Sequence, residues 1–168
     1  MIEIERTFLA KHIPEGIKDG KEILDIAIPS TARHPNLRIR KYGNKIEITK
    51  KEMVNKGDAS VHKELTIPLT EEEYKEFSQL EGKRMRKIRY KYDHDGNTAE
   101  VDVYQDKLKG LVVIDFEFET TEEKDNFEMP DFCLKDVTQE EVIAGGLLVG
   151  KSYEDIEEKL TEFGYKKI

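Results

Sequence analysis

The stretch LRIRKYGNKIEIT at residues 37–49 decides the fold, because apolar and charged side chains alternate along it on both sides of a turn. In its first half, leucine and isoleucine alternate with Arg38 and Arg40, and in its second half two isoleucines alternate with Glu47 and a threonine. A period of two places successive side chains on opposite faces of a β-strand. The YGNK sequence at residues 42–45 is typical of a hairpin turn. The stretch therefore predicts two antiparallel strands, each with one apolar and one polar face.

The same alternation recurs along most of the chain, and HDGNT at residues 94–98 supplies a second hairpin turn. Further strands are expected near residues 2–5, 22–29, 61–68, 85–92, 100–104 and 115–119. Together with the first two, these make about eight short strands joined by turns. Such a pattern is typical of an antiparallel barrel.

Three segments carry helical signals instead. Thr70, followed by three glutamates, is a capping sequence, and the helix that it opens is expected to end at Gly82. A second helix is expected to start at Ser152, and a weaker one at residues 138–148 contains a Gly-Gly pair that lowers helix propensity. Without repeats or linkers, the pattern predicts one α+β domain over residues 1–168, an eight-stranded antiparallel β-barrel with helices packed outside it.

Composition restricts the class of protein. The 168 residues carry 28 Lys and Arg against 36 Asp and Glu, a formal net charge of −8, and one cysteine, which excludes an intrachain disulfide. No apolar run approaches the roughly 20 residues of a membrane span, and the start MIEIERTF lacks the plan of a signal peptide. We expect a cytoplasmic monomer or homodimer with neither a membrane nor a nucleic acid as partner. The basic run GKRMRKIRYKY at residues 82–92 could be a nucleic-acid-binding strand, but the net charge argues against it.

The polar faces of the predicted strands are segregated by charge. Some strands present only acids and others present bases, and residues i and i+2 lie about 7 Å apart on one face. If these faces turn outward, they form an ordinary solvated surface. If they turn into a closed barrel, several carboxylates require divalent cations and several guanidinium groups require a polyanion. The second alternative predicts a phosphate chain bound with Mg²⁺ or Mn²⁺, the ions that hard oxygen ligands favour.

An ordered set of short motifs resembles the CYTH superfamily, the triphosphate tunnel metalloenzymes. The motifs are EIER at 3–6, RIR at 38–40, ITKK at 48–51, ELTIP at 64–68, KIRY at 87–90, EVDVY at 100–104, GLVVIDFE at 110–117 and FEMPDFCLKDVT at 127–138. The resemblance implies an eight-stranded antiparallel tunnel that hydrolyses triphosphates or, in one branch, cyclises ATP. It also implies a small-molecule triphosphate as the partner and Mg²⁺ or Mn²⁺ as the cofactor.

The resemblance also implies roles for individual residues. The metal ligands would be Glu3, Glu5, Glu64, Asp102, Asp115 and Glu117. The substrate-binding residues would be Arg38, Arg40, Lys51, Lys87 and Arg89, with Lys50 as the weaker alternative to Lys51. Glu5, Lys87 and Arg89 would be the catalytic residues. These lysine and arginine side chains would neutralise the phosphate chain and stabilise the charge on the leaving group.

Two departures from the family pattern affect the expected activity. Thr7 stands where the Glu-x-Glu-x-Lys signature has its lysine, and a tyrosine and an asparagine after Val137-Thr138 are missing. Lys11 or the other bases could compensate in part for the lost lysine. The leading hypothesis is a metal-dependent hydrolase of inorganic tripolyphosphate or another small triphosphate. The alternatives are a class IV adenylyl cyclase and a catalytically weak triphosphate- or polyphosphate-binding module.

Three other patterns have a simpler interpretation. GGLLVGKS at residues 145–152 matches the phosphate-loop pattern, but TQEEVIA before it is not strand-like and few residues follow it, so a flexible connection is favoured. The four histidines lie on separate segments without metal-ligand spacing, and we expect them at surface or turn positions. Cys133 lies in an apolar stretch, which indicates a small core residue rather than a nucleophile.

Overall fold

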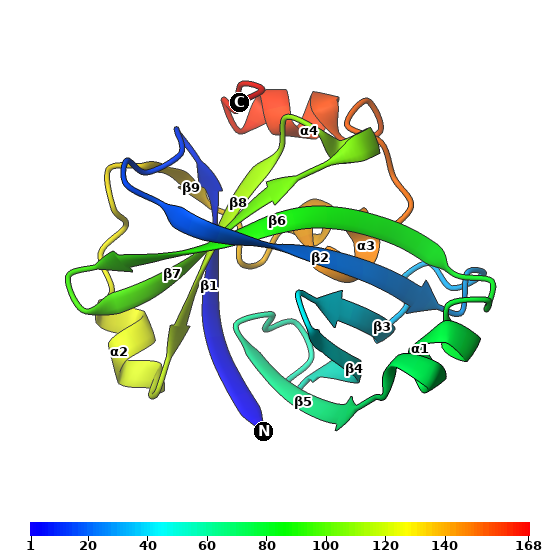
Figure 1. Cartoon of the computed structure of the whole chain (residues 1–168). Helices are drawn as coiled ribbons and strands as arrows, with labels where there is room; N and C mark the ends of the chain where they lie inside the picture. Colours follow the sequence, from blue (N-terminus) through cyan, green and yellow to red (C-terminus); the bar gives the residue numbers. More distant parts are fainter.

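The computed structural model describes residues 1–168 and contains nine strands and four short α-helices (Figure 1). The strands are β1 (Ile2–Ala10), β2 (Lys18–Ile28), β3 (Leu37–Tyr42), β4 (Lys45–Met53), β5 (Val61–Pro68), β6 (Lys83–His94), β7 (Asn97–Tyr104), β8 (Val112–Phe118) and β9 (Cys133–Asp136). The helices are α1 (Glu71–Phe77), α2 (Thr121–Asn126), α3 (Gly145–Leu148) and α4 (Glu157–Glu162), with 3₁₀ turns at Asp106–Leu108 and Glu141–Ile143. None of these helices is long and apolar enough to cross a membrane.

Eight of the strands close into an antiparallel barrel, as expected. The hydrogen-bonded order is β5-β4-β3-β2-β6-β7-β8-β1, and β1 pairs with β5 to close the circle. In this closing pair, Glu3 lies opposite His62. The ninth strand, β9, pairs with the second half of β1 from Phe8 to Ala10 and was not predicted. Closure of the barrel decides which face of each strand becomes interior.

The inward faces are charged along most of the barrel and apolar at one end. On β1, Glu3 and Glu5 face inward together with Leu9, because they share strand parity. Leu9 belongs to the larger buried apolar cluster, which combines inward residues of several strands with residues of the C-terminal segment such as Leu148 and Ile156. Figure 1 places α4 and the C-terminus at one end of the barrel, and the N-terminus of β1 at the opposite end. The C-terminal segment therefore packs against one end of the interior.

A second apolar cluster lies on the outer faces of β1, β7 and β8. Its members include Phe8, Val101 and Phe116, and the last two alternate with charged residues. Phe8 and Phe116 pack edge to face at 5.9 Å between ring centroids, and Phe127 after α2 covers Phe116 at 4.5 Å. Aromatic pairs of this kind add stability beyond the area that they bury. The outer cluster thus explains why α2 and its flanking segment pack beside β1 and β8.

Local sequence signals are reproduced best at turns and caps. In the β6–β7 hairpin, Asp95 and Gly96 both have positive φ (52° and 83°), as a tight hairpin turn of that sequence requires. Helix α1 starts with the expected capping box, in which the Thr70 hydroxyl accepts from the Glu73 backbone amide at 3.2 Å. Capping sequences therefore located the helix start directly.

Helix boundaries differ from the predictions. Helix α1 ends at Phe77, because the chain turns at Ser78 rather than continuing to Gly82. Helix α4 begins at Glu157 instead of Ser152, whose backbone amide donates to the carboxylate of Asp155 at 2.7 Å in a turn before the helix. The expected 138–148 helix is split into the 3₁₀ turn and α3. Helix α2 was missed, although Thr120 and Glu123 form a capping box.

Candidate active site

One cavity of about 750 Å³ is lined by the charged inward faces of the strands. The predicted site residues that line it are Glu3, Glu5, Arg38, Arg40, Lys51, Glu64, Lys87, Arg89, Asp115 and Glu117. They come from β1, β3, β4, β5, β6 and β8, so barrel closure brings together residues that are far apart in the sequence. The segregated charges thus face one cavity. Asp102 is fully buried behind the lining residues.

Asp25 on β2 holds the basic pair of β3 and was missed by sequence reasoning. Its carboxylate accepts from Nε and Nη2 of Arg40 at 2.8 and 2.9 Å, and lies 3.8 Å from Nη1 of Arg38. Burial disfavours the charged carboxylate, but Arg40 and Arg38 outweigh this effect and keep the pKa of Asp25 well below its usual value. The signal was an acid flanked on both sides by apolar residues within the EILDIAIP strand.

Arg38 differs from the other four predicted cations of the cavity because it has no close counter-ion. Its Nε is buried without a hydrogen-bond partner, and its shortest ion-pair distance is the 3.8 Å to Asp25. Burial and the neighbouring Arg40 lower the pKa of Arg38. The guanidinium group of Arg38 is therefore the one most available to an anion entering the cavity.

The basic pair of β6 is neutralised by acids of the neighbouring β7. Arg89 donates to both oxygens of Asp102 at 2.7 Å and also pairs with Glu100, and Lys87 donates to Asp102. Burial alone would raise the pKa of Asp102, but Arg89 and Lys87 lower it to about 2. Burial and the nearby guanidinium groups lower the pKa of Lys87. Asp102 therefore acts as a counter-ion here rather than as a free ligand.

Lys51 faces the cavity and lies between the two acids of β1. Its ammonium group is 3.0 Å from Glu3 and 2.8 Å from both oxygens of Glu5. Lys50 pairs with Glu52 instead, so strand parity correctly favoured Lys51. Burial disfavours ionisation of Glu5, but Lys51 outweighs it, and the pKa of Glu5 is lowered.

Two histidines also line this cavity; His62 lies on a strand, which corrects the expectation of surface or turn positions, whereas His34 is exposed in a bend as expected. Nδ1 of His62 on β5 is buried without a hydrogen-bond partner and lies 3.4 Å from Oε1 of Glu5. Burial and the charge of Lys51 lower the pKa of His62. His34 lies near Arg38, and burial together with Arg38 lowers the pKa of His34. The sequence pattern does not single out either histidine as a cavity residue, because neither has another metal-ligating residue at a characteristic spacing.

The acidic wall formed by β1 and β8 lacks comparable neutralisation. Burial, then the charges of Glu5 and Asp102, raise the pKa of Asp115 to about 7, although Arg89 lies 3.8 Å away. Burial and neighbouring glutamates also raise the pKa of Glu117, which is in none of the ion pairs of the interior. This wall therefore carries surplus negative charge.

Thr7 lies in this acidic wall, as its parity with Glu5 predicted. Its hydroxyl donates to Oδ1 of Asp115 at 2.7 Å, and its backbone amide donates to the Thr138 hydroxyl at 3.0 Å. A hydroxyl supplies no positive charge at this position. Lys11 is exposed at the end of β1 and does not line the cavity, so the structure does not support it as a replacement cation.

The acidic wall fits a divalent cation in charge and donor chemistry. Carboxylate oxygens of Glu3, Glu5, Asp115 and Glu117 face one cavity, and oxygen is the ligand that Mg²⁺ and Mn²⁺ prefer. No three His, Cys, Asp or Glu side chains are arranged around one point as in a metal-bound site. Instead, the ammonium group of Lys51 supplies the positive charge between Glu3 and Glu5.

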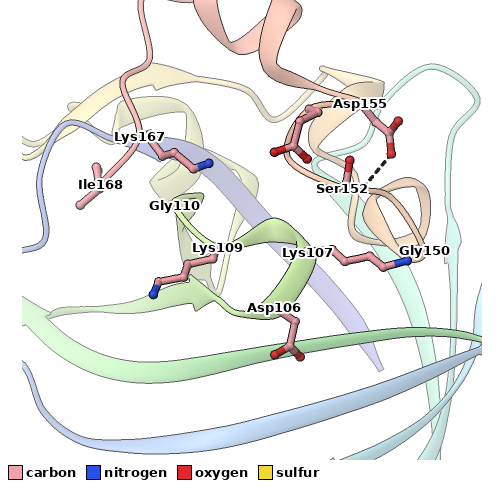
Figure 2. A pocket seen from close by; sticks show the side chains of 10 residues that line it. Asp106, Lys107, Lys109, Gly110, Gly150, Ser152, Asp155, Lys167 and Ile168 are labelled. Carbon is pink, nitrogen blue, oxygen red and sulfur yellow. Dashed lines mark hydrogen bonds between the residues drawn. The ribbon is translucent and has the colours of Figure 1, made fainter.

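The GGLLVGKS sequence is not a phosphate-binding loop in this fold. A 3₁₀ turn rather than a strand precedes it, and its first four residues form α3. Figure 2 shows Gly150 and Ser152 beside a surface hollow of about 630 Å³, which Lys107 and Lys167 also line. The Ser152 amide already donates to Asp155 (Figure 2), so it is not free to bind phosphate.

Two other sequence expectations can be compared with the structure. Cys133 is a buried core residue, and burial raises the pKa of its thiol to about 12, which agrees with a packing role. In the 82–92 run, Lys87 and Arg89 face the cavity, whereas Arg86 on the outer face pairs with Asp106 and Glu22. The run therefore presents no continuous basic surface.

Comparisons with known proteins find one sequence relative and several solved structures of the same fold. No family model matches the chain. An inorganic triphosphatase of Nitrosomonas europaea is 28% identical over 142 residues, which cover 83% of this chain and 91% of the relative. The crystal structure of an inorganic triphosphatase superimposes with a TM-score of 0.66 at 24% identity, covering 89% of this chain and 95% of that one. A putative adenylate cyclase from Bacillus halodurans shares the fold, with a TM-score of 0.54 at 16% identity, covering 99% of this chain and 91% of that one.

The chain is therefore similar in sequence to an inorganic triphosphatase and shares the barrel fold of these solved structures.

Proposed function

We propose that this protein hydrolyses a small triphosphate, inorganic tripolyphosphate or a small organic triphosphate, with the help of Mg²⁺ or Mn²⁺. The observation that carries the proposal is that five cationic side chains and an under-neutralised acidic wall face the same cavity. Basic side chains alone could bind any anion, and acidic side chains alone could bind any cation. Their combination fits a polyanion that is bound together with a metal ion. The similarity to inorganic triphosphatases supports the same reaction.

Substrate binding in this proposal begins at Arg38. Arg38 lacks a close counter-ion, whereas Arg40 is held by Asp25 on one side of its guanidinium group. The other bases must exchange carboxylate partners for phosphate oxygens. Lys51 would leave Glu3 and Glu5 in this exchange, which would free both carboxylates for the metal ion.

Hydrolysis places water on the terminal phosphorus and breaks the bridging P–O bond, whose electron pair leaves with the diphosphate product. Lys87 and Arg89 would stabilise the charge that develops on the phosphate oxygens. Glu3, Glu5 and Glu117, with Glu64 and Asp115, would hold the divalent cation. That ion supplies Lewis-acid stabilisation of the transferring phosphoryl group.

The test is one preparation assayed for three outcomes. Phosphate release from tripolyphosphate and from ATP, cyclic AMP formation from ATP, and calorimetric binding of tripolyphosphate are measured with and without Mg²⁺ or Mn²⁺. Metal-dependent phosphate release without cyclic AMP supports the proposal. Cyclic AMP with diphosphate release would favour the cyclase, and binding without turnover would favour the binding module.

A matched pair of arginine variants tests the site itself. Arg38→Gln should lower kcat/KM for the triphosphate by about tenfold or more, because one charged phosphate contact contributes about 1.5–3 kcal/mol. Arg33→Gln removes an exposed arginine that pairs with Glu141 outside the set of inward bases, and should leave kcat/KM unchanged. Equal effects of the two variants would contradict the assignment.

A further inference from the structure

His62 is a cavity residue to which the proposed reaction assigns no role. It lies on β5, opposite Glu3 of β1 in the strand pair that closes the barrel. Its side chain is 14% exposed, and its Nδ1 lies 3.4 Å from Oε1 of Glu5. The imidazole ring thus lies beside the carboxylates of the acidic wall and Lys51.

Packing alone does not account for this imidazole. Nδ1 is buried and has no hydrogen-bond partner, and leaving a buried polar atom unsatisfied costs about 1–3 kcal/mol. The contact with Glu5 at 3.4 Å does not satisfy Nδ1, because it lacks the geometry of a hydrogen bond. A nitrogen with a free lone pair beside two carboxylates is instead suited to bind a cation.

We propose that Nδ1 of His62 is a ligand of the divalent cation held by Glu3 and Glu5, and that it makes this site favour a first-row transition-metal ion such as Mn²⁺ over Mg²⁺. The inference rests on the proposed function only in that a divalent ion enters the cavity. Mg²⁺ takes oxygen ligands almost exclusively, so an imidazole adds little to its binding. Transition-metal ions gain affinity from an imidazole ligand.

The position of Lys51 is consistent with this site. Its ammonium group lies 3.0 Å from Glu3 and 2.8 Å from Glu5, and thus stands in for a cation next to His62. When Lys51 turns to a phosphate, the ion can take its place. The other cavity histidine, His34, lies beside the cationic Arg38, where a second cation is disfavoured. His34 is therefore the matched control for His62.

The experiment measures metal binding without any triphosphate. Binding of Mn²⁺ alone and of Mg²⁺ alone is measured by calorimetry for the wild type, His62→Asn, His62→Gln and His34→Asn, after circular dichroism has established that each is folded. Electron spin-echo spectroscopy of Mn²⁺ bound to the wild type reports directly whether a histidine nitrogen is a ligand. The spin-echo measurement needs only the wild-type protein, so it tests the inference even if a substitution prevents folding.

We expect a ¹⁴N coupling in the wild type, and a loss of Mn²⁺ affinity by about tenfold or more in both His62 variants. Their Mg²⁺ affinity should change by less than roughly threefold, and His34→Asn should leave both affinities within the same range. Absence of the ¹⁴N coupling, or equal loss of Mn²⁺ and Mg²⁺ affinity, would overturn the inference. Mn²⁺ binding through His62 without triphosphate hydrolysis would instead refute only the proposed function.

Discussion

Two aspartates on neighbouring strands show how differently the two sides of the cavity are built. Asp102 on β7 is fully buried, with Arg89 and Lys87 as hydrogen-bond partners, and its pKa is lowered to about 2. Asp115 on β8 is about 20% exposed, accepts from the Thr7 hydroxyl, and has its pKa raised to about 7. The more deeply buried aspartate is therefore the stronger acid.

The difference shows that counter-ions rather than burial decide the charge state in this barrel. Two cations reach Asp102 because β6 and β7 are paired, with Arg89 directly opposite it. The residue of β1 that lies directly opposite Asp115 is Thr7, which is not a cation. On the β6–β7 side the acids and bases of the protein neutralise one another. On the β1–β8 side the acids remain to be neutralised by a bound cation.

The largest expected effect comes from breaking the neutral side. Asp102→Asn leaves Lys87 and Arg89 buried with one charged partner fewer, and should lower the free energy of unfolding by about 3 kcal/mol or more. Urea denaturation at neutral pH measures this loss. Asp106→Asn is the control, since Asp106 pairs with Arg86 on the exposed surface, and it should lower the free energy of unfolding far less than Asp102→Asn does. Similar losses in both variants would contradict the comparison.

The next largest effect concerns activity on the acidic side. Glu5→Gln and Glu117→Gln each remove a carboxylate from the wall that we propose holds the metal ion. Turnover should fall by about a hundredfold or more, equivalent to about 2.7 kcal/mol, and the metal dependence should be lost with it. Phosphate release across a Mg²⁺ and Mn²⁺ titration provides the measurement. Undiminished turnover at saturating metal would refute the assignment, and Glu122→Gln on exposed α2 should behave as the wild type.

A smaller effect should follow from adding the missing cation. In Thr7→Lys, an ammonium group replaces the hydroxyl beside Asp115 and faces the phosphate cavity. We expect kcat/KM for the triphosphate to rise by about tenfold, equivalent to about 1.4 kcal/mol. Thr7→Ser keeps the hydroxyl and should leave kcat/KM unchanged. If Thr7→Lys folds but lowers kcat/KM, the cavity is adapted to a ligand other than a triphosphate.

The smallest effect is the pH dependence of stability in metal-free protein. Because the folded-state pKa of Asp115 is raised to about 7, the folded state holds a proton that the unfolded state loses near pH 4. Stability from this group is therefore lost as the pH rises from about 4 to about 7. Asp115→Asn should raise the free energy of unfolding by about 1 kcal/mol at pH 8, roughly 2–4 °C in Tm, and change it little at pH 4. Thermal unfolding of both proteins in EDTA at the two pH values measures this, and a Tm of Asp115→Asn below that of the wild type at pH 8 would contradict the raised pKa.

The strands could be predicted from the sequence because alternation is a local property. Each of the predicted strands is present, and parity correctly placed Lys51 rather than Lys50 in the cavity. Strand β9 was missed because CLKD is too short to show alternation. Helix α4 was placed too early because a turn held by Asp155 resembles a helix start.

The sequence by itself determined which side chains share a strand face, since the period of two is a property of the extended backbone. It could not determine whether the charged faces turn inward, because that depends on the pairing of β1 with β5. The tertiary structure also decided the counter-ions, because Asp25 and His62 acquire their partners Arg40 and Glu5 from other strands. Charge state depends on such neighbours in space, and only closure of the barrel brings those neighbours together.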